Sequence, residues 1–201
     1  MGLLLSTLNR ERERKIVMFY YAGIGSRKTP DTILTAFETL GERLASIGGV
    51  LRSGRAAGAD SAFERGCIAA NGTSEIYVPW KGFPKGSDLA GYPAIILDHI
   101  GLEQYAKAIA SIDIYHPAPG RLSEPAKKLM ARNYCQMFGD RLDAPVSDFV
   151  VCYTEDGRAS GGTGQAIRMA DDHGIKVFNA HGFEANPDAF VNLVVQYASE
   201  L

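Results

Sequence analysis

Apolar and polar residues follow one another along this chain in blocks that predict an α/β fold. Residues 16–21, IVMFYY, form a continuous apolar run that stops at Gly23 and Gly25, and such a run is typical of a parallel strand buried on both faces. Thr29-Pro30-Asp31 then has the composition of a helix start, with a capping hydroxyl, a proline at the first helical position and an acid in the first turn. The apolar residues that follow at spacings of four and three mark one helical face: Ile33, Phe37, Leu40, Leu44 and Ile47.

The same alternation of strand and helix continues along the rest of the chain. Further strands are predicted over residues 50–53, 75–78, 149–153 and 176–178, and further helices over residues 59–70, 94–112, 124–138, 164–172 and from residue 186 onward. This order predicts a single open, mostly parallel Rossmann-like sheet with helices on both faces and right-handed crossovers. Residues 1–15, which include the alternating charges RERERK, are predicted to be a solvated lead-in, and residues 16–201 one domain.

Composition narrows the class of protein. The 201 residues are 46% hydrophobic and carry a formal charge of -2, which disfavours a globally basic nucleic-acid binder but not a local basic patch. Three distant cysteines, Cys67, Cys135 and Cys152, predict buried reduced thiols, and the four scattered histidines have no zinc spacing. No run approaches the roughly 20 apolar residues that span a bilayer. We therefore expect a cytoplasmic protein without a metal or cofactor.

Three glycine loops carry the candidate chemistry. Each follows a predicted strand and opens a predicted helix, so all three should meet at the carboxyl edge of the sheet, where open α/β sheets bind ligands. Backbone N–H groups at glycines and at helix N-termini bind anions, so the loops predict a phosphate-bearing ligand. The candidate phosphate-binding residues are Gly23, Gly25, Ser26 and Arg27 in the first loop, Ser53, Gly54, Arg55 and Gly58 in the second, and Gly161, Gly162, Thr163, Gly164 and Gln165 in the third.

Two features leave alternatives open. Asp60, at the end of the second loop, would cap the following helix or else accept hydrogen bonds from a ribose or a base. The loop of residues 79–91, with the adjoining Tyr92, would form a lid or packed loop, or else a surface on which bases stack, because it interleaves aromatic residues with lysines. Those residues are Trp80, Lys81, Phe83, Lys85 and Tyr92.

The second loop also carries a resemblance to a known family. Its sequence from Ser53 to Asp60 resembles the SGxAxGxD signature of the DprA/Smf DNA-processing family, which belongs with the LOG-type phosphoribohydrolases to a wider Rossmann-like superfamily. Gly25-Ser26-Arg27 is similar to the DprA opening. Arg132-Asn133 resembles a residue pair that both groups carry before their last glycine loop, and Gly161 to Gly164 stand where LOG proteins carry PGGxGT. The resemblance spans roughly residues 17–180.

The third loop departs from the LOG pattern. Ser160 replaces the proline of that motif, Gln165 replaces its threonine, and Arg168 stands at the position that matches the glutamate of the LOG hydrolases. These differences argue against N-glycoside hydrolysis by the LOG mechanism.

The loops and the resemblance together imply a nucleotide-phosphate-binding protein for a free nucleotide or a nucleotide-derived ligand, with Asn133 among its binding residues. One alternative is cleavage of the N-glycosidic bond of a nucleoside monophosphate, which needs a carboxylate near the sugar; the candidate catalytic residues are Asp60, Arg132 and Glu124. Another is a DprA-like protein that binds single-stranded DNA in DNA processing. Whether the chain is an enzyme stays open, and the resemblance implies a homo-oligomer.

Overall fold

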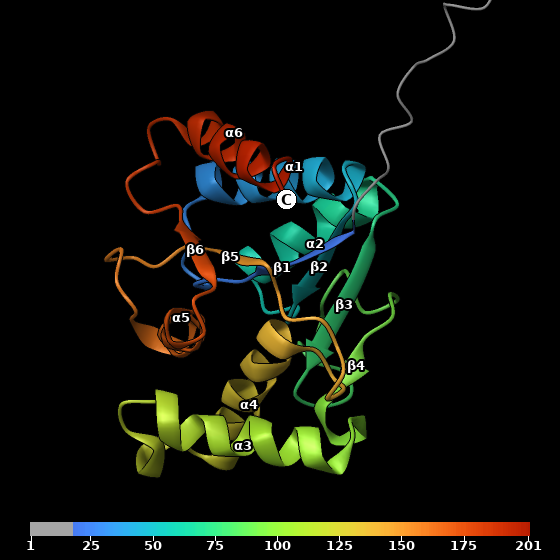
Figure 1. Cartoon of the computed structure of the whole chain (residues 1–201), viewed down its shortest axis with the longest axis vertical. Coiled ribbons are helices and arrows are strands. Elements are labelled where there is room, and N and C mark those ends of the chain that lie inside the picture. The colour runs from blue at the N-terminus through green and yellow to red at the C-terminus, as the bar shows by residue number, and fades with distance from the viewer. Residues whose placement is uncertain (1–17) are drawn as a thin grey trace, which may run out of the picture.

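Six strands form one sheet in which every neighbouring pair is parallel (Figure 1). The computed structural model describes residues 18–201, so the predicted lead-in and the first two residues of the predicted first strand lie outside the described residues. The strand order is β4-β3-β2-β1-β5-β6, which confirms the predicted open, parallel, Rossmann-like sheet. The strands are β1 Phe19–Gly23, β2 Gly49–Ser53, β3 Thr73–Val78, β4 Ile95–Ile96, β5 Phe149–Cys152 and β6 Lys176–Asn179.

Helices cover both faces of this sheet, as predicted (Figure 1). One face carries α1 Asp31–Ser46, α2 Ala59–Ala69 and α6 Pro187–Ala198. The other carries α4 Glu124–Phe138 and α5 Gly161–Asp172, and α3 Leu102–Tyr115 packs on the outer side of α4. Two single-turn 3-10 helices, η1 Leu97–His99 and η2 Pro119–Arg121, flank α3. Within residues 18–201, no helix has the length and apolar character that a membrane crossing requires.

The apolar pattern of α1 explains how this layer packs. Four of its five predicted core positions are fully buried, and Phe37 stacks on Phe63 of α2 with ring centroids 4.3 Å apart. The helix begins differently from the prediction, because the Thr29 hydroxyl does not cap it. That hydroxyl instead donates to the Ser26 carbonyl over 2.7 Å and closes the turn after β1. All three cysteines are buried and free, as predicted.

The predicted helix over residues 94–112 is wrong in its first half. Ile95 and Ile96 form β4 and pair with Tyr77 and Val78 at the end of β3, so two β-branched residues complete the sheet edge. A 3-10 turn follows, and the helix α3 begins only after Gly101. Pairing with an open strand edge therefore outweighs the helical spacing of this segment.

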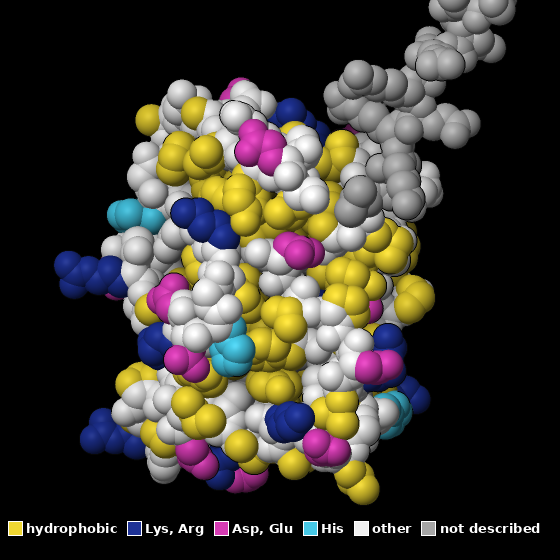
Figure 2. Space-filling view, viewed as in Figure 1, with side chains coloured by type: hydrophobic (Ala, Val, Ile, Leu, Met, Phe, Trp, Pro, Cys, Tyr) yellow, Lys and Arg dark blue, Asp and Glu magenta, His cyan; other side chains and the backbone are white. Residues whose placement is uncertain are grey.

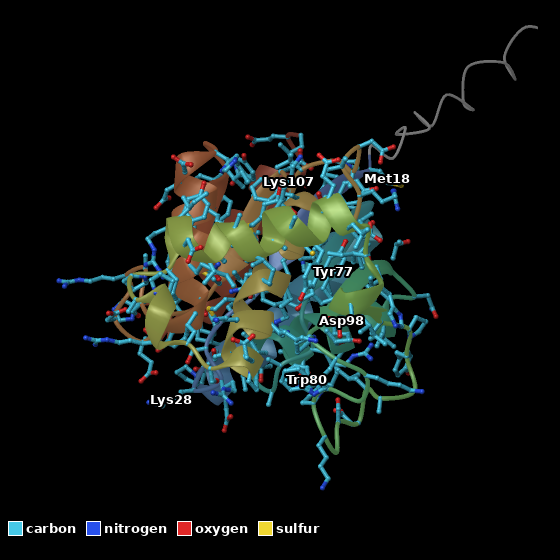
Figure 3. The ribbon with its side chains drawn as sticks, turned by 90° about the horizontal axis from the view of Figure 1, so that it is seen from below. Met18, Lys28, Tyr77, Trp80, Asp98 and Lys107 are labelled. Atoms are coloured by element: carbon cyan, nitrogen blue, oxygen red, sulfur yellow. The ribbon has the colours of Figure 1, made fainter. Side chains whose placement is uncertain are left out.

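The strand order places a crevice beside β1. From β1 the chain moves outward through β2 and β3 on one side, whereas β5 and β6 lie on the other side, so the connections after β1 and β5 diverge. The loops after the strands lie on one rim of the molecule. Figure 3 shows Lys28 and Trp80 at this rim and Met18 at the opposite one. The fold thus brings the predicted loops to one edge.

Candidate functional site

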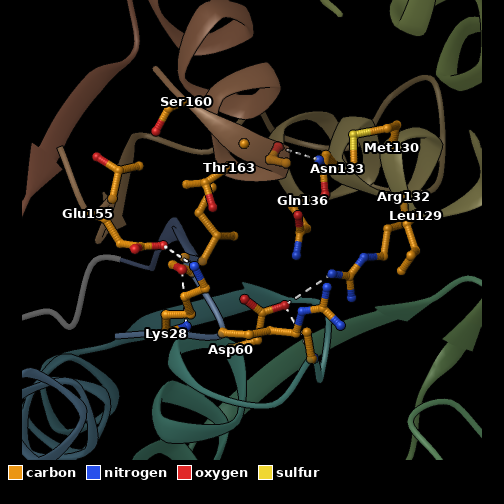
Figure 4. Close-up of a pocket in the computed structure, with 18 of the residues that line it drawn as sticks. Lys28, Asp60, Leu129, Met130, Arg132, Asn133, Gln136, Glu155, Ser160 and Thr163 are labelled. Atoms are coloured by element: carbon orange, nitrogen blue, oxygen red, sulfur yellow. Dashed lines mark hydrogen bonds and ion pairs between the residues drawn. The ribbon is translucent and has the colours of Figure 1, made fainter. Parts of the chain in front are cut away.

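A pocket of about 320 Å³ opens at the point where the strand order reverses. Its size falls at the lower end of the range that small-molecule sites occupy, about 300–1,000 Å³. Figure 4 shows it between α4 and the first turn of α5 on one side and the loops after β1 and β2 on the other. Of the predicted site residues, nine line this pocket: Gly25, Ser26, Arg27, Asp60, Arg132, Asn133, Gly161, Gly162 and Thr163.

The loop after β1 brings positive charge to the pocket. The Ser26 N–H donates to the Tyr153 carbonyl over 3.1 Å, which ties this loop to the end of β5. Arg27 is exposed and lines the pocket together with Arg132, so the two cations face a common space. Lys28 forms a 3.6 Å ion pair with Glu155 from the loop after β5. Arg27 is therefore the cation of this loop that the pocket holds without a counter-ion among residues 18–201.

The third glycine loop is the first turn of α5 rather than a loop before it. The helix begins at Gly161, so N–H groups of its first turn have no acceptor within the helix and lie at the pocket. A Cβ added at Gly162 would meet the flexible end of Met130 at 3.1 Å. Gly164 and Gln165 lie behind this turn and do not line the pocket, and a Cβ at Gly164 would collide with the Ala159 carbonyl.

The helix α4 turns one face toward the pocket, and that face carries apolar as well as polar residues. Its N-terminus is capped by Ser123, whose hydroxyl accepts a hydrogen bond from the Ala126 N–H over 3.4 Å. The pocket-lining residues of α4 recur at spacings of three and four, which places them on one face of the helix. They are Leu129, Met130, Arg132, Asn133 and Gln136.

A buried ion pair joins α4 to the second glycine loop. Arg132 Nη2 lies 3.3 Å from Asp60 Oδ2, and both side chains are more than nine-tenths buried. Arg132 Nη1 donates to the Gly54 carbonyl, and a Cβ at Gly54 would collide with this guanidinium. Asp60 Oδ2 also accepts from the Ala56 N–H over 3.3 Å. Asp60 therefore does not cap α2, whose N-cap is Gly58, but holds Arg132 and its own loop together.

The signature residues from Ser53 to Asp60 thus serve largely to pack the second loop against its neighbours. Ser53 Oγ donates to the Gly23 carbonyl over 2.6 Å, which ties the second loop to the first. Gly58 has a φ of 93° and lies against the backbone of Ser26, a combination that only glycine adopts without strain. Gly23, Ser53, Gly54 and Gly58 therefore support the pocket without lining it.

The surroundings of Asp60 and Arg132 shift the pKa values of both side chains. Burial raises the pKa of the Asp60 carboxyl, while the charge of Arg132 and the N–H groups of Ala56 and Gly25 oppose this rise. Burial likewise lowers the pKa of Arg132 against the effect of Asp60. Arg132 Nε has no hydrogen-bond partner within residues 18–201. The pocket floor thus holds a buried carboxyl beside a guanidinium that has one unused donor.

Three charged residues that the sequence analysis considered lie away from the pocket. Arg55 is buried, and its guanidinium donates to the Glu64 carboxylate and to the carbonyls of residues 92 and 93. It therefore does not line the pocket. Glu124 is exposed at the start of α4 and pairs with Lys127 over 2.8 Å. Arg168 donates to the Tyr115 and Ala159 carbonyls, so the position of the LOG glutamate faces the α3 side here.

Gln136 is a site residue that the sequence analysis missed. Its side chain lines the pocket, is 1% exposed, and has an amide nitrogen without a partner in the described part of the chain. Figure 4 shows this amide directed into the pocket near Arg132. The spacing of Gln136 from Arg132, four residues along one helix, was a signal that could have identified it. In residues 18–201, no cluster of three His, Cys, Asp or Glu side chains is arranged to hold a metal ion.

Comparison with known proteins finds similarity in structure alone. No protein-family model and no curated protein sequence matches this chain. The Moco carrier protein of Chlamydomonas rheinhardtii is similar in structure, with a TM-score of 0.53 and 17% identity over 92% of this chain and 97% of that one. DprA of Streptococcus pneumoniae aligns with a TM-score of 0.48 and 15% identity over 90% of this chain and 57% of that one. DprA of Helicobacter pylori, described for its single-stranded DNA binding mode, aligns with a TM-score of 0.41 and 14% identity over 89% and 81%.

These likenesses concern the fold. At 17% identity, the match to the Moco carrier protein indicates a shared α/β architecture over nearly the whole of both chains. The Rossmann-like architecture expected from the DprA and LOG resemblance is therefore confirmed.

Proposed function

We propose that this chain binds a nucleotide or a nucleotide-derived ligand through its phosphate in the pocket between β1 and β5. The observation that carries the proposal is the convergence of the first turn of α5, Arg27 and Arg132 on one pocket at the sheet's switch point. Free N–H groups and the positive end of the helix dipole favour an anion at the start of α5.

The charges of the pocket are consistent with this assignment. Asp60 offsets the charge of Arg132, and Glu155 offsets that of Lys28. Arg27 makes no ion pair within residues 18–201, so it leaves one positive charge beside the helix terminus. A guanidinium can grip two phosphate oxygens at once. The volume of about 320 Å³ suits a mononucleotide better than a dinucleotide.

A panel of nucleotides tests the proposal. Ligand binding should raise the melting temperature, by an amount that grows with ligand concentration. Gly162→Val places side-chain bulk at the phosphate position and should abolish the shift, whereas within residues 18–201 the atom that a Cβ at this position would meet is the flexible end of Met130. Gly101→Val is the matched control, because it makes the same change at the start of α3, where a Cβ would meet no atom of residues 18–201 within 4 Å apart from its chain neighbours. Equal binding by wild type and the folded Gly162→Val variant would contradict the proposal.

A second candidate function is hydrolysis of the N-glycosidic bond of a nucleoside monophosphate. The specific observation in its favour is the Asp60 carboxyl, which is buried at the pocket with a raised pKa. Glu124, the other acid among the candidate catalytic residues, does not line the pocket, and neither does Glu64 of α2. Chromatography of the same incubations tests this reaction, because hydrolysis releases free base. If no nucleotide that binds yields free base, the hydrolase assignment is wrong and the binding function stands.

Two further assignments remain predictions. Single-stranded DNA binding, suggested by the DprA resemblance, predicts an affinity that falls steeply with salt as counterions are released. A small-nucleotide site predicts a modest dependence on salt. Because the Moco carrier protein is similar to this chain in structure, Moco should be included in the ligand panel. The predicted homo-oligomer is tested by light scattering of the purified chain.

A further inference from the structure

One wall of the pocket is apolar. Phe83, from the segment between β3 and β4, lines the pocket together with Leu129 and Met130 of α4. In Figure 4, Leu129 and Met130 lie on the side away from Lys28 and Glu155. A ligand that consisted of phosphate and sugar alone would leave this wall in contact with water.

The Phe83 ring is held in place by its neighbours. Its centroid lies 5.4 Å from that of Trp80 in an edge-to-face arrangement, and the Phe83 N–H donates to the Trp80 carbonyl over 3.3 Å. Arg132 Cζ lies 5.4 Å from the same ring centroid. Phe83 is half-buried against the main core, so part of the ring remains available to the pocket.

Arg55 fixes the far end of this segment. Its Nη1 donates to the Tyr92 carbonyl over 3.1 Å and its Nη2 to the Pro93 carbonyl over 2.9 Å. The Glu64 carboxylate balances the Arg55 charge, with its Oε1 3.0 Å from Nε, and both residues are at least 97% buried. The segment is thus anchored to α2 without the ligand, and Arg55 acts as a positioning residue for the wall rather than as a phosphate ligand.

We infer that Phe83, with Leu129 and Met130, receives the planar ring of the ligand, so that the pocket selects a nucleotide over a sugar phosphate. The inference rests on the proposed function, since it requires the phosphate at α5. An aromatic side chain and apolar residues favour a planar ring by burying its faces. The ring then covers the apolar wall, and the phosphate reaches the helix terminus.

The fluorescence of Trp80 can report the binding of a ring against Phe83. Trp80 is the sole tryptophan of the sequence, and it contacts Phe83 directly. A ring that packs against Phe83 changes the surroundings of the indole. Ribose 5-phosphate has the same anion but lacks the ring, so it should bind and leave tryptophan emission unchanged.

Titration with ribose 5-phosphate and with nucleoside 5′-monophosphates tests the inference. We expect the best monophosphate to bind at least tenfold more tightly than ribose 5-phosphate and to change Trp80 emission. Phe83→Ala should lose about five- to a hundredfold in monophosphate affinity and leave ribose 5-phosphate affinity within about twofold. Phe183→Ala is the matched control, because Phe183 is also half-buried but lies beside α6, outside this pocket.

The outcomes separate this inference from the function on which it rests. If ribose 5-phosphate and the monophosphates bind equally, with unchanged emission, the ring site is wrong and phosphate binding stands. If none of them binds, both assignments are overturned. A Phe83→Ala variant that loses ribose 5-phosphate to the same extent would also contradict the ring site, because the loss would then be general.

Discussion

Replacing Asp60 by asparagine tests the buried ion pair that joins the second loop to α4. The substitution keeps the size of the side chain and an oxygen that can accept from the Ala56 N–H, but it removes the negative charge 3.3 Å from Arg132 Nη2. Arg132 is 7% exposed, so its guanidinium would remain largely buried without a counter-ion. A plain helix cap would tolerate this change, because asparagine caps about as well as aspartate.

The expected cost follows from the burial of both partners. Removing one member of a buried pair costs about 3–5 kcal/mol, because the other charge is left uncompensated. Asparagine retains one hydrogen bond, so we expect about 3 kcal/mol, the lower end of that range. For a chain of this length, such a loss lowers the melting temperature by about 6–12 °C.

Urea unfolding at pH 7 measures the loss, and a double-mutant cycle assigns it. Arg132→Met in the Asp60→Asn background removes the stranded charge, so the double variant should lose at least 1 kcal/mol less than the sum of the two single losses. A single loss below about 1 kcal/mol, together with additive behaviour, would refute the ion-pair reasoning.

The remaining predictions concern buried groups away from the pocket. Burial raises the pKa of Cys67 to about 11 and those of Cys135 and Cys152 to about 12, so a thiol reagent at pH 8 should label the native chain very slowly and all three thiols after unfolding. Since these values exceed those of the unfolded chain, the free energy of unfolding should fall as pH rises from about 9 to 11, which pH-dependent urea titrations can check. Glu64→Gln leaves the buried Arg55 charge without its counter-ion and should lower the free energy of unfolding by about 3 kcal/mol in the same assay. Residues 79–94 should then be cleaved faster by a protease, and an unchanged cleavage rate would argue against Arg55 as their anchor.

Local patterns predict much of this fold. The predicted bounds of α4 match the structure, because Ser123, a proline in the first turn and Gly139 at the end mark both termini locally. The meeting of the three loops is also predictable, since parallel strands present their carboxyl ends at one edge. By contrast, β4 depends on a free strand edge at β3, which lies nearly 20 residues earlier in the chain and leaves no mark in the helical spacing of residues 94–112.

Side-chain direction is the part of the site that the sequence leaves open. Arg27 and Arg55 stand in comparable loops after strands, yet Arg27 lines the pocket and Arg55 does not. Arg55 adopts a φ of 56° and meets Glu64, nine residues onward on α2, so its direction depends on a tertiary contact. The role of Asp60 likewise depends on Arg132, which lies 72 positions away.

The position of β1 in the middle of the sheet determines when the pocket can exist during folding. One neighbour of β1, β2, is made soon after it, but the other, β5, comes much later: the Tyr20 N–H donates to Asp148 Oδ2 across 128 positions. Closing so large a loop carries an entropic cost and slows folding. On the ribosome, β1 would therefore hold one open edge until β5 emerges, and the first turn of α5 follows later still. The nascent β1–β3 unit therefore lacks part of the pocket lining, and a ligand of this pocket would bind only after the sheet is complete.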